Sequence, residues 1–138
     1  VPPEQLIFEI TESGVMLNPE VALQVLHGLR ACGISLSVDD FGTGYSSLSY
    51  LSSLKVQRIK IDKSFIQGIN QDLQLQRVVR SIIELCGHFD VVVVAEGVET
   101  QEQAQWLKAN GCPFVQGPWA APPLMAGAVV DWLRARSC

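Results

Sequence analysis

The sequence has no long uninterrupted apolar run and no basic N-terminal leader. A membrane-spanning helix needs roughly 18 to 20 apolar residues in a row, and no stretch here reaches that length. The N-terminal residues Val1 to Glu4 carry no basic flank of the kind found in signal peptides. We therefore expect a soluble, cytoplasmic region. A start at Val1 instead of Met suggests a piece of a longer chain, whose upstream segments can include a membrane tether or a sensor domain.

The sequence also lacks an excess of basic residues and any close pair of cysteines. A net charge of -4 and a pI near 5.0 argue against duplex nucleic acid binding, which requires a basic surface. There is no CxxC pair, and neither histidine stands at zinc-site spacing from a cysteine. We expect reduced and mostly buried thiols at the four scattered cysteines, Cys32, Cys86, Cys112 and Cys138.

Short apolar segments alternate with longer amphipathic ones, which predicts five strand–helix units. The predicted strands are Leu6–Ile10, Ile34–Val38, Arg58–Ile61, Val91–Ala95 and Phe114–Gln116. The predicted helices are Pro19–Cys32, Tyr45–Leu54, Leu73–Cys86, Gln101–Asn110 and Ala126–Arg136. Pro19, Gly33, Gly87 and Gly111 are predicted to mark helix ends. Strands joined through helices pair in parallel, because only a crossover returns the chain to the same sheet edge.

The fold class is therefore α/β, with parallel strand–helix repeats. Periodicity does not decide between an open sheet and a closed barrel. A closed eight-stranded barrel takes about 250 residues, so 138 residues would supply only the later portion of a TIM-type (β/α) barrel. Strands that lose their barrel neighbours expose apolar surface and unpaired edges, so we expect a homodimer or other self-association.

Charged residues gather where the predicted strands end: Glu9 and Glu12, Asp39 and Asp40, Lys60 and Asp62, Glu96 and Glu99. In α/β barrels this edge carries the chemistry, because the loops after the strands converge there. Glu12, Asp62 and Glu99 have an equally good structural explanation as acids or caps at helix N-termini.

Asp39 and Asp40 are harder to explain structurally, because two adjacent carboxylates repel each other unless a cation lies nearby. Adjacent strand residues point to opposite faces, so both reach one site only if the extended geometry breaks. The segment Phe41-Gly42-Thr43-Gly44 is predicted to supply that break. The alternative is that the same residues form only a tight turn between a strand and a helix.

Carboxylates from several strands, without histidine or cysteine, favour hard divalent cations such as Mg²⁺ or Mn²⁺. Two such ions can activate a water and stabilise both oxygens of an in-line phosphoryl displacement. Lys60 is predicted to lie beside that water or a phosphate, since a lysine on a buried strand is rare without a partner.

The chain resembles the EAL-domain family, whose members are phosphodiesterases that linearise the bacterial second messenger cyclic di-GMP. The resemblance covers nearly all of residues 1–138 and identifies them as a partial EAL domain, without the early strands that carry the Glu-Ala-Leu signature. It rests on Glu9–Ser13, Asp39–Leu48, Lys60–Phe65, Val94–Thr100, and Gly111-Cys112 through Gln116-Gly117.

The resemblance implies a role for each matched residue. Glu9, Asp39, Asp40 and Glu96 would be metal ligands, with Asp39 bridging two ions. Lys60 would be the catalytic lysine, and Glu12 would steady the loop from Asp39 to Ser46, which the family also uses in dimerisation. Gln116 would contact substrate, and Asp62 and Glu99 would support the site.

Two departures qualify this expectation. The signature glutamate and a later asparagine ligand are absent from these residues, so the isolated fragment is expected to be inactive while its parent hydrolyses cyclic di-GMP. The segment Pro118–Leu124 also lacks the aromatic and basic residues that usually follow Gln116-Gly117. The alternative is a non-catalytic module that binds cyclic di-GMP or a partner protein. The family also implies upstream GGDEF or sensor domains in the parent.

Overall fold

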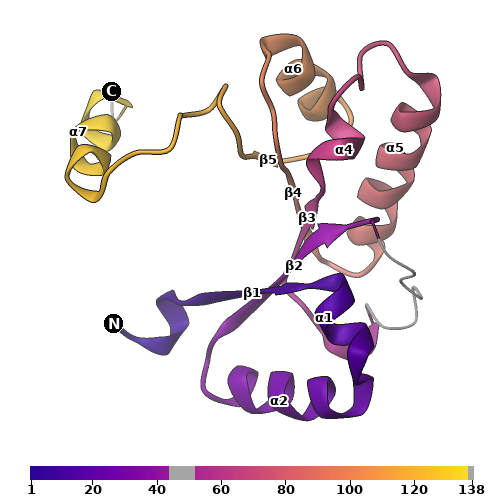
Figure 1. Cartoon of the computed structure of the whole chain (residues 1–138), viewed down its shortest axis with the longest axis vertical. Coiled ribbons are helices and arrows are strands. Elements are labelled where there is room, and N and C mark those ends of the chain that lie inside the picture. The colour runs from indigo at the N-terminus through magenta and orange to yellow at the C-terminus, as the bar shows by residue number, and fades with distance from the viewer. Residues whose placement is uncertain (44–51, 137–138) are drawn as a thin grey trace.

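The computed structural model describes residues 1–43 and 52–136, where five strands form one parallel sheet (Figure 1). The strands are β1 (Ile7–Thr11), β2 (Ser35–Phe41), β3 (Arg58–Ile61), β4 (Val92–Ala95) and β5 (Phe114–Val115). Their order across the sheet follows the sequence, and every neighbouring pair is parallel. Sequential parallel strands with intervening helices form a partial (β/α) barrel, which confirms the predicted fold class.

The described helices are η1 (Pro3–Gln5), α1 (Glu12–Leu17), α2 (Pro19–Ala31), α4 (Lys63–Ile66), α5 (Leu73–His88), α6 (Gln101–Ala109) and α7 (Ala126–Arg136). Most of the predicted helix at 45–54 lies outside the described residues. The sequence did not predict η1, α1 or α4, because helices of 3, 6 and 4 residues are too short to show helical periodicity. Gly87 lies inside α5, so its prediction as a helix end was wrong.

Polar side chains cap the longer helices where they begin. Asn18 accepts a hydrogen bond from the Val21 amide at the start of α2, and Asp72 accepts one from the Gln74 amide at the start of α5. Thr100 begins α6 with a reciprocal capping box to Gln103. These caps satisfy helix N–H groups that have no partner within the helix, and so fix where each crossover starts relative to the strand before it.

Apolar side chains from the central strands form the core. Leu36, Ile59 and Ile61 are fully buried, and Val79 and Cys86 of α5 pack into the same cluster. Both Cys86 and Cys112 are buried, as predicted, whereas Cys32 is exposed and Cys138 lies outside the described residues. The central strands are therefore covered, and they provide a rigid base for the residues at their ends.

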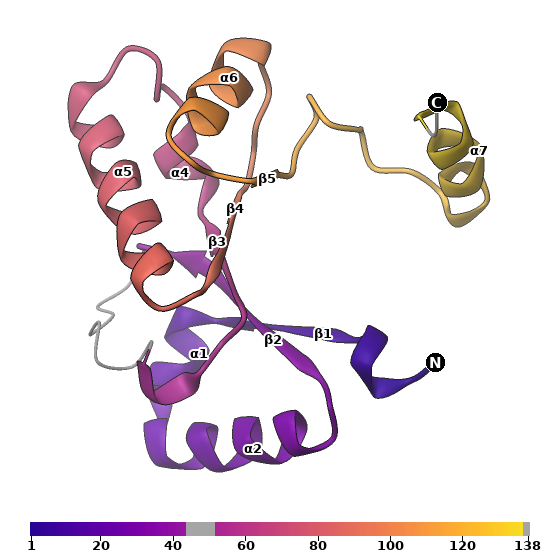
Figure 2. The same cartoon turned by 180° about the vertical axis from the view of Figure 1, so that it is seen from behind.

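The outer parts of the sheet are much less covered. Within the described residues, β1 and β5 each pair with a single neighbouring strand, and Ile7 and Phe8 of β1 are each 42% exposed. An apolar hollow of about 290 Å³ opens between β1, α1 and α2, where Ile10, Val15 and Val25 are among its lining residues. Helix α7 has no buried residue and stands apart from the other helices in both views (Figures 1 and 2).

Among the described helices, none combines the length and apolar character that crossing a bilayer requires.

Candidate metal centre

Four neighbouring strands bring charged side chains to one edge of the sheet. Glu9 stands opposite Ser37 in the register of β1 and β2, and Asp39 stands opposite Thr11. Lys60 stands opposite Val94 in the register of β3 and β4, and Glu96 directly follows β4. The positions differ slightly from the sequence prediction. Glu9 lies within β1, two residues before its end, and Glu12 directly follows that strand as the first residue of α1.

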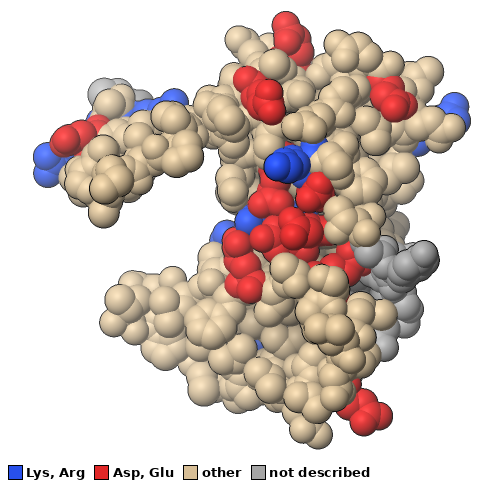
Figure 3. All heavy atoms as spheres, in the orientation of Figure 1, with Lys and Arg blue, Asp and Glu red and all other residues tan. Residues whose placement is uncertain are grey.

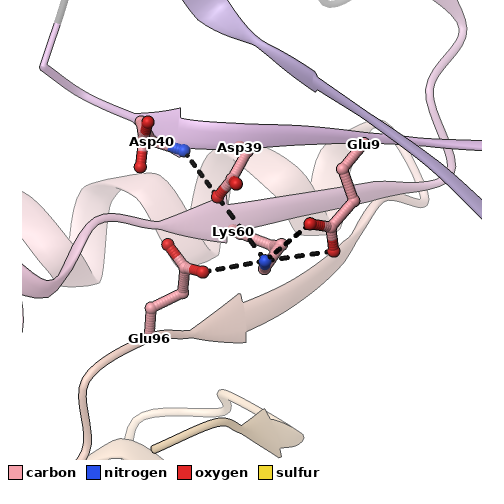
Figure 4. A network of polar contacts seen from close by, with 5 residues as sticks. All are labelled: Glu9, Asp39, Asp40, Lys60 and Glu96. Atoms are coloured by element: carbon pink, nitrogen blue, oxygen red, sulfur yellow. Dashed lines mark hydrogen bonds and ion pairs between the residues drawn. The ribbon is translucent and has the colours of Figure 1, made fainter.

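Lys60 lies at the centre of this group, with its side chain only 7% exposed (Figure 4). Its Nζ is 2.8 Å from Glu96 Oε1 and 3.0 Å from each carboxylate oxygen of Glu9. Asp39 Oδ1 lies further away, at 3.6 Å. Three carboxylates from three strands thus surround one ammonium group, which explains how a lysine persists on a buried strand.

The surroundings of Lys60 favour its charged form. Burial acts to lower the pKa of the Lys60 ammonium, but the hydrogen bonds that it donates to Glu96 and then to Glu9 outweigh burial and raise that pKa above its ordinary value. The pKa of Glu96 is also raised, because burial disfavours its anion more than Lys60 stabilises it. Lys60 therefore remains a cation at neutral pH. A further positive charge nearby would stabilise the ionised form of Glu96.

The chain leaves extended geometry at Asp40. Its φ is 54°, in the left-handed region that Asp and Asn tolerate better than most residues. The Asp40 amide donates to Asp39 Oδ1 at 2.9 Å, and the Thr43 hydroxyl donates to the Asp40 carbonyl at 2.7 Å. The break therefore begins at the second aspartate itself, one step before the Phe41-Gly42-Thr43-Gly44 segment that was predicted to supply it.

This break brings the adjacent aspartates to a common site with Glu96. One carboxylate oxygen from each of Asp39, Asp40 and Glu96 lies within 4.8 Å of the others. Burial, followed by the charges of Asp39 and Asp62, raises the pKa of Asp40. In the space-filling view, acidic side chains gather in the middle of this face with basic side chains beside them (Figure 3). A donor set of carboxylates alone fits a hard divalent cation.

Glu12 is buried, with 5% of its surface exposed, and it points at the loop that follows β2. Its Oε2 accepts a hydrogen bond of 3.1 Å from the Gly42 amide. A buried carboxylate that accepts a backbone N–H fixes the path of that backbone. The role in steadying the loop remains a prediction beyond Thr43, because residues 44–51 lie outside the described part of the chain.

The loops at the same edge carry the other three predicted site residues, Asp62, Glu99 and Gln116. Asp62 caps α4 by accepting from the Ser64 amide at 2.7 Å. A hydrogen bond from the Ser64 side chain, followed by this amide bond, holds the pKa of Asp62 below its usual value. Glu99 is exposed beside the start of α6. The exposed Gln116 is held by its backbone, since its amide donates to the Ala95 carbonyl at 2.8 Å.

Sequence reasoning missed Gln103, which organises the loop after Glu96. Its Oε1 accepts from the Glu99 amide at 2.8 Å and from the Thr100 amide at 3.2 Å, while Nε2 donates to the Ile66 carbonyl at 3.4 Å. The Thr100-x-x-Gln103 spacing is a capping-box signal that the sequence carries. The contact with Ile66 has no sequence signal, because it joins segments 37 residues apart.

The fold and the acidic cluster define a parallel α/β domain of the barrel type, with a carboxylate-lined cation site at the carboxyl ends of its strands. The comparisons with known proteins identify the particular family. The EAL domain family matches residues 1–123, and the chain belongs to that family.

Curated relatives agree with this assignment. The cyclic di-GMP phosphodiesterase NbdA of Pseudomonas aeruginosa is 42% identical over 130 residues, which are 94% of this chain and 17% of NbdA. The probable cyclic di-GMP phosphodiesterase PdeN of Escherichia coli is 39% identical over 94% of this chain and 25% of PdeN. The chain thus spans a quarter or less of the length of these relatives.

Solved structures show the same relationship. A cyclic di-GMP complex of the Pseudomonas aeruginosa MucR phosphodiesterase superposes with a TM-score of 0.90 at 40% identity, covering 94% of this chain and 52% of that one. A manganese and cyclic di-GMP complex of Klebsiella pneumoniae BlrP1 superposes with a TM-score of 0.80 at 38% identity, covering 85% and 30% of the two chains.

Proposed function

We propose that this chain forms the later portion of a cyclic di-GMP phosphodiesterase domain and supplies most of its divalent-metal ligands and its catalytic lysine. The observation that carries the proposal is the convergence of Asp39, Asp40 and Glu96 beside Lys60. The similarity to NbdA and to the MucR complex supports the choice of substrate.

The residues present fit a pair of Mg²⁺ or Mn²⁺ ions. Asp39 lies between Asp40 and Lys60 (Figure 4), and one carboxylate oxygen from each of Asp39, Asp40 and Glu96 lies within 4.8 Å of the others. These three residues would hold the ions, with Asp39 shared between them, and Glu9, which contacts Lys60, would be a further ligand. The manganese and calcium complexes of BlrP1 support a divalent cation without deciding which ion this chain takes.

When bound, the ions would lower the pKa of a coordinated water and neutralise the phosphodiester. Lys60 would donate hydrogen bonds to the attacking water or to a phosphate oxygen, because its raised pKa keeps it protonated and its neighbours fix its position. Water adds to phosphorus, one P–O ester bond breaks, and the leaving oxygen takes a proton. The product is the linear dinucleotide.

The remaining site residues would bind and orient. Glu12 would hold the Gly42 backbone through its 3.1 Å hydrogen bond. Gln116 is exposed at the same edge and would contact a guanine or the phosphodiester. Asp62 and Glu99 would support the loops on either side of the ligands.

We further propose that the parent protein carries additional domains. MucR, which is 41% identical over 90% of this chain, is named a bifunctional diguanylate cyclase and cyclic di-GMP phosphodiesterase. The chain covers only 18% of MucR, so a cyclase or sensor domain in the parent accords with that architecture. The exposed apolar residues of β1 and α7 support self-association of the isolated chain.

A chimaera tests the proposed function directly. Residues 1–123 replace the matching part of the MucR phosphodiesterase domain, whose remaining strands complete the barrel. We expect Mg²⁺- or Mn²⁺-dependent conversion of cyclic di-GMP to the linear dinucleotide, and loss of turnover in the Asp39→Asn chimaera. A folded chimaera that binds Mn²⁺ but never cleaves cyclic di-GMP would contradict the catalytic assignment.

A further inference from the structure

Helix α4 (Lys63–Ile66) lies between two loops that carry metal-site residues. It follows β3 directly, and both neighbours of β3 are bonded to the strand end where the helix begins. The Asp62 amide donates to the Phe41 carbonyl at 3.5 Å on one side. The Glu96 amide donates to the Ile61 carbonyl at 3.1 Å on the other. The helix therefore begins between the loop that follows Asp40 and the loop that begins at Glu96.

The first contact of α4 joins Phe65 to Gly42, two residues after Asp40. Gly42 has φ 101°, and a Cβ on it would lie 2.7 Å from Cε2 and 2.9 Å from Cζ of the Phe65 ring. These distances are far below normal contact, so the ring packs directly against the glycine backbone. The Gly42 amide also donates a hydrogen bond of 3.1 Å to Glu12 Oε2. Gly42 therefore contacts both a carboxylate and an aromatic ring.

The second contact joins Lys63 to Gly97, the residue after Glu96. Gly97 has φ 68°, and a Cβ on it would lie 2.5 Å from Lys63 Cβ and 3.3 Å from Lys63 Cα. The Lys63 side chain is exposed, so the contact comes from the base of the side chain and not from its charge. One short helix thus touches the backbone beside both acidic loops.

We propose that α4 is a positioning brace for the metal centre, in which Phe65 and the Lys63 Cβ set the separation of Asp40 and Glu96. This inference rests on the proposed function, because it concerns the same ligands. Ligand groups must be held to within a fraction of an ångström for tight binding, and supporting residues commonly change metal affinity by about 10- to 100-fold. Phe65 packs on the Gly42 backbone, so in this proposal it acts through the loop.

Substitution of Phe65 in the full chain tests the brace. Phe65 is partly exposed, so Phe65→Ala is expected to fold. We expect its Mn²⁺ affinity, measured from the electron paramagnetic resonance signal of free Mn²⁺, to fall about 10-fold. Phe65→Leu, which keeps much of the packing volume, should recover part of the affinity. Val78→Ala on α5 is the matched control, since Val78 is 40% exposed and is not among the nearest neighbours that a Cβ added at Gly42 or Gly97 would meet, and it should bind Mn²⁺ like the wild type.

A metal-free measurement separates the brace from the proposed function. The side-chain carboxyl carbons of Asp40 and Glu96 are followed by ¹³C NMR at one neutral pH without metal. Phe65→Ala should shift the Asp40 resonance and leave that of Asp131 on α7 unchanged. Gly97→Ala should shift Glu96 in the same way. Gly28→Ala should shift neither, because an added Cβ there would meet nothing within 4 Å beyond its chain neighbours and the backbone of its own helix.

The outcomes distinguish the two ideas. If the wild type binds Mn²⁺ and Phe65→Ala binds it equally well with unshifted carboxyl resonances, the brace is refuted and the metal centre stands. If the wild type binds no Mn²⁺ yet Phe65→Ala shifts the Asp40 resonance, the brace stands as a device that positions Asp40, and metal binding by the ligands of this chain alone is refuted. Folding is checked in each variant by circular dichroism, and a Phe65→Ala chain that unfolds is replaced by Phe65→Leu for both measurements.

Discussion

Lys60 and Glu96 form an ion pair of 2.8 Å between the ends of two neighbouring strands, with both side chains largely withdrawn from solvent. Glu9 reaches the same ammonium group from the far side of β2. In the described residues this lysine neutralises charges that a divalent cation would otherwise offset. The ion pair therefore links the stability of the domain to the chemistry of its site.

Replacing Lys60 with methionine should destabilise the metal-free chain. The substitution keeps most of the side-chain volume but leaves Glu9, Asp39 and Glu96 without their cation, so we expect a loss of about 2 kcal/mol. Mn²⁺ should restore part of this loss, because a bound cation screens the same carboxylates. Urea denaturation in EDTA and in Mn²⁺ measures both effects, and equal stability of Lys60→Met and wild type in EDTA would show that the cluster does not depend on this charge.

The contribution of Lys60 should also depend on pH in a defined direction. Its pKa is raised in the folded state, so its stabilisation is fully present below the unfolded pKa of about 10.4 and is lost as the pH rises above that value. The stability difference between wild type and Lys60→Met should be constant from pH 7 to about pH 10 and shrink in more alkaline solution. A difference that already declines between pH 7 and pH 9 would contradict the assigned direction.

Asp40→Asn should stabilise the metal-free chain while weakening its affinity for Mn²⁺. The raised pKa of Asp40 means that its anion is disfavoured in the folded state, so ionised Asp40 lowers stability above its ordinary pKa. Asparagine removes that charge and tolerates the φ of 54°. We expect a higher melting temperature at pH 7 in EDTA, no gain below about pH 3, and at least a 10-fold loss of Mn²⁺ affinity.

A matched variant shows whether loss of any one carboxylate charge has the same effect. Asp131 on α7 is exposed and lies outside the acidic cluster, so Asp131→Asn should change neither property. A lower melting temperature for Asp40→Asn in EDTA would mean that its carboxylate makes a stabilising contact that outweighs the repulsion.

The sequence predicted the parallel fold and the gathering of acids at one edge because both follow from local patterns. Short, mostly apolar runs of three to five residues separated by amphipathic segments predict parallel strands, and the acids lie at or just after the ends of those runs. The placement of Asp39 and Glu96 at one edge could therefore be predicted from the sequence alone. The partners of Lys60 were not predictable in detail, because its contacts with Glu9 and Glu96 depend on register and on side-chain conformation.

The parts that the sequence did not predict depend on close contacts between distant segments. Helix α4 has too few residues for periodicity, and the packing of Phe65 on Gly42 appears only when both loops are placed. The bend at Asp40 was predicted one step late, since Gly42 has a strong preference for positive φ and Asp40 a weak one. The short helix and the positive φ of Asp40 were therefore the features that the sequence pattern could not predict.

Among the cysteines that the structure describes, the two buried thiols should react far more slowly than the exposed thiol of Cys32. Burial raises the pKa of Cys86 to about 11 and also raises that of Cys112, whereas Cys32 is exposed. The thiolate is the reactive form. Iodoacetamide at pH 8 should therefore modify Cys32 in the folded chain and reach Cys86 and Cys112 only in denaturant. Peptide mass spectrometry gives the extent at each site, and rapid modification of Cys86 without denaturant would indicate that the core around α5 opens.

The isolated chain should self-associate through its uncovered β1 edge. Ile7 is 42% exposed there, and an exposed apolar edge strand readily pairs with another chain. We expect concentration-dependent dimers or larger species by size-exclusion chromatography with light scattering. Ile7→Lys should shift the distribution towards monomer, because a lysine at the edge opposes pairing. Val78→Lys on α5 is the control, since that site has nearly the same exposure, 40%, but lies on a helix. A wild-type chain that remains monomeric at every concentration would show that the open sheet is stable without a partner.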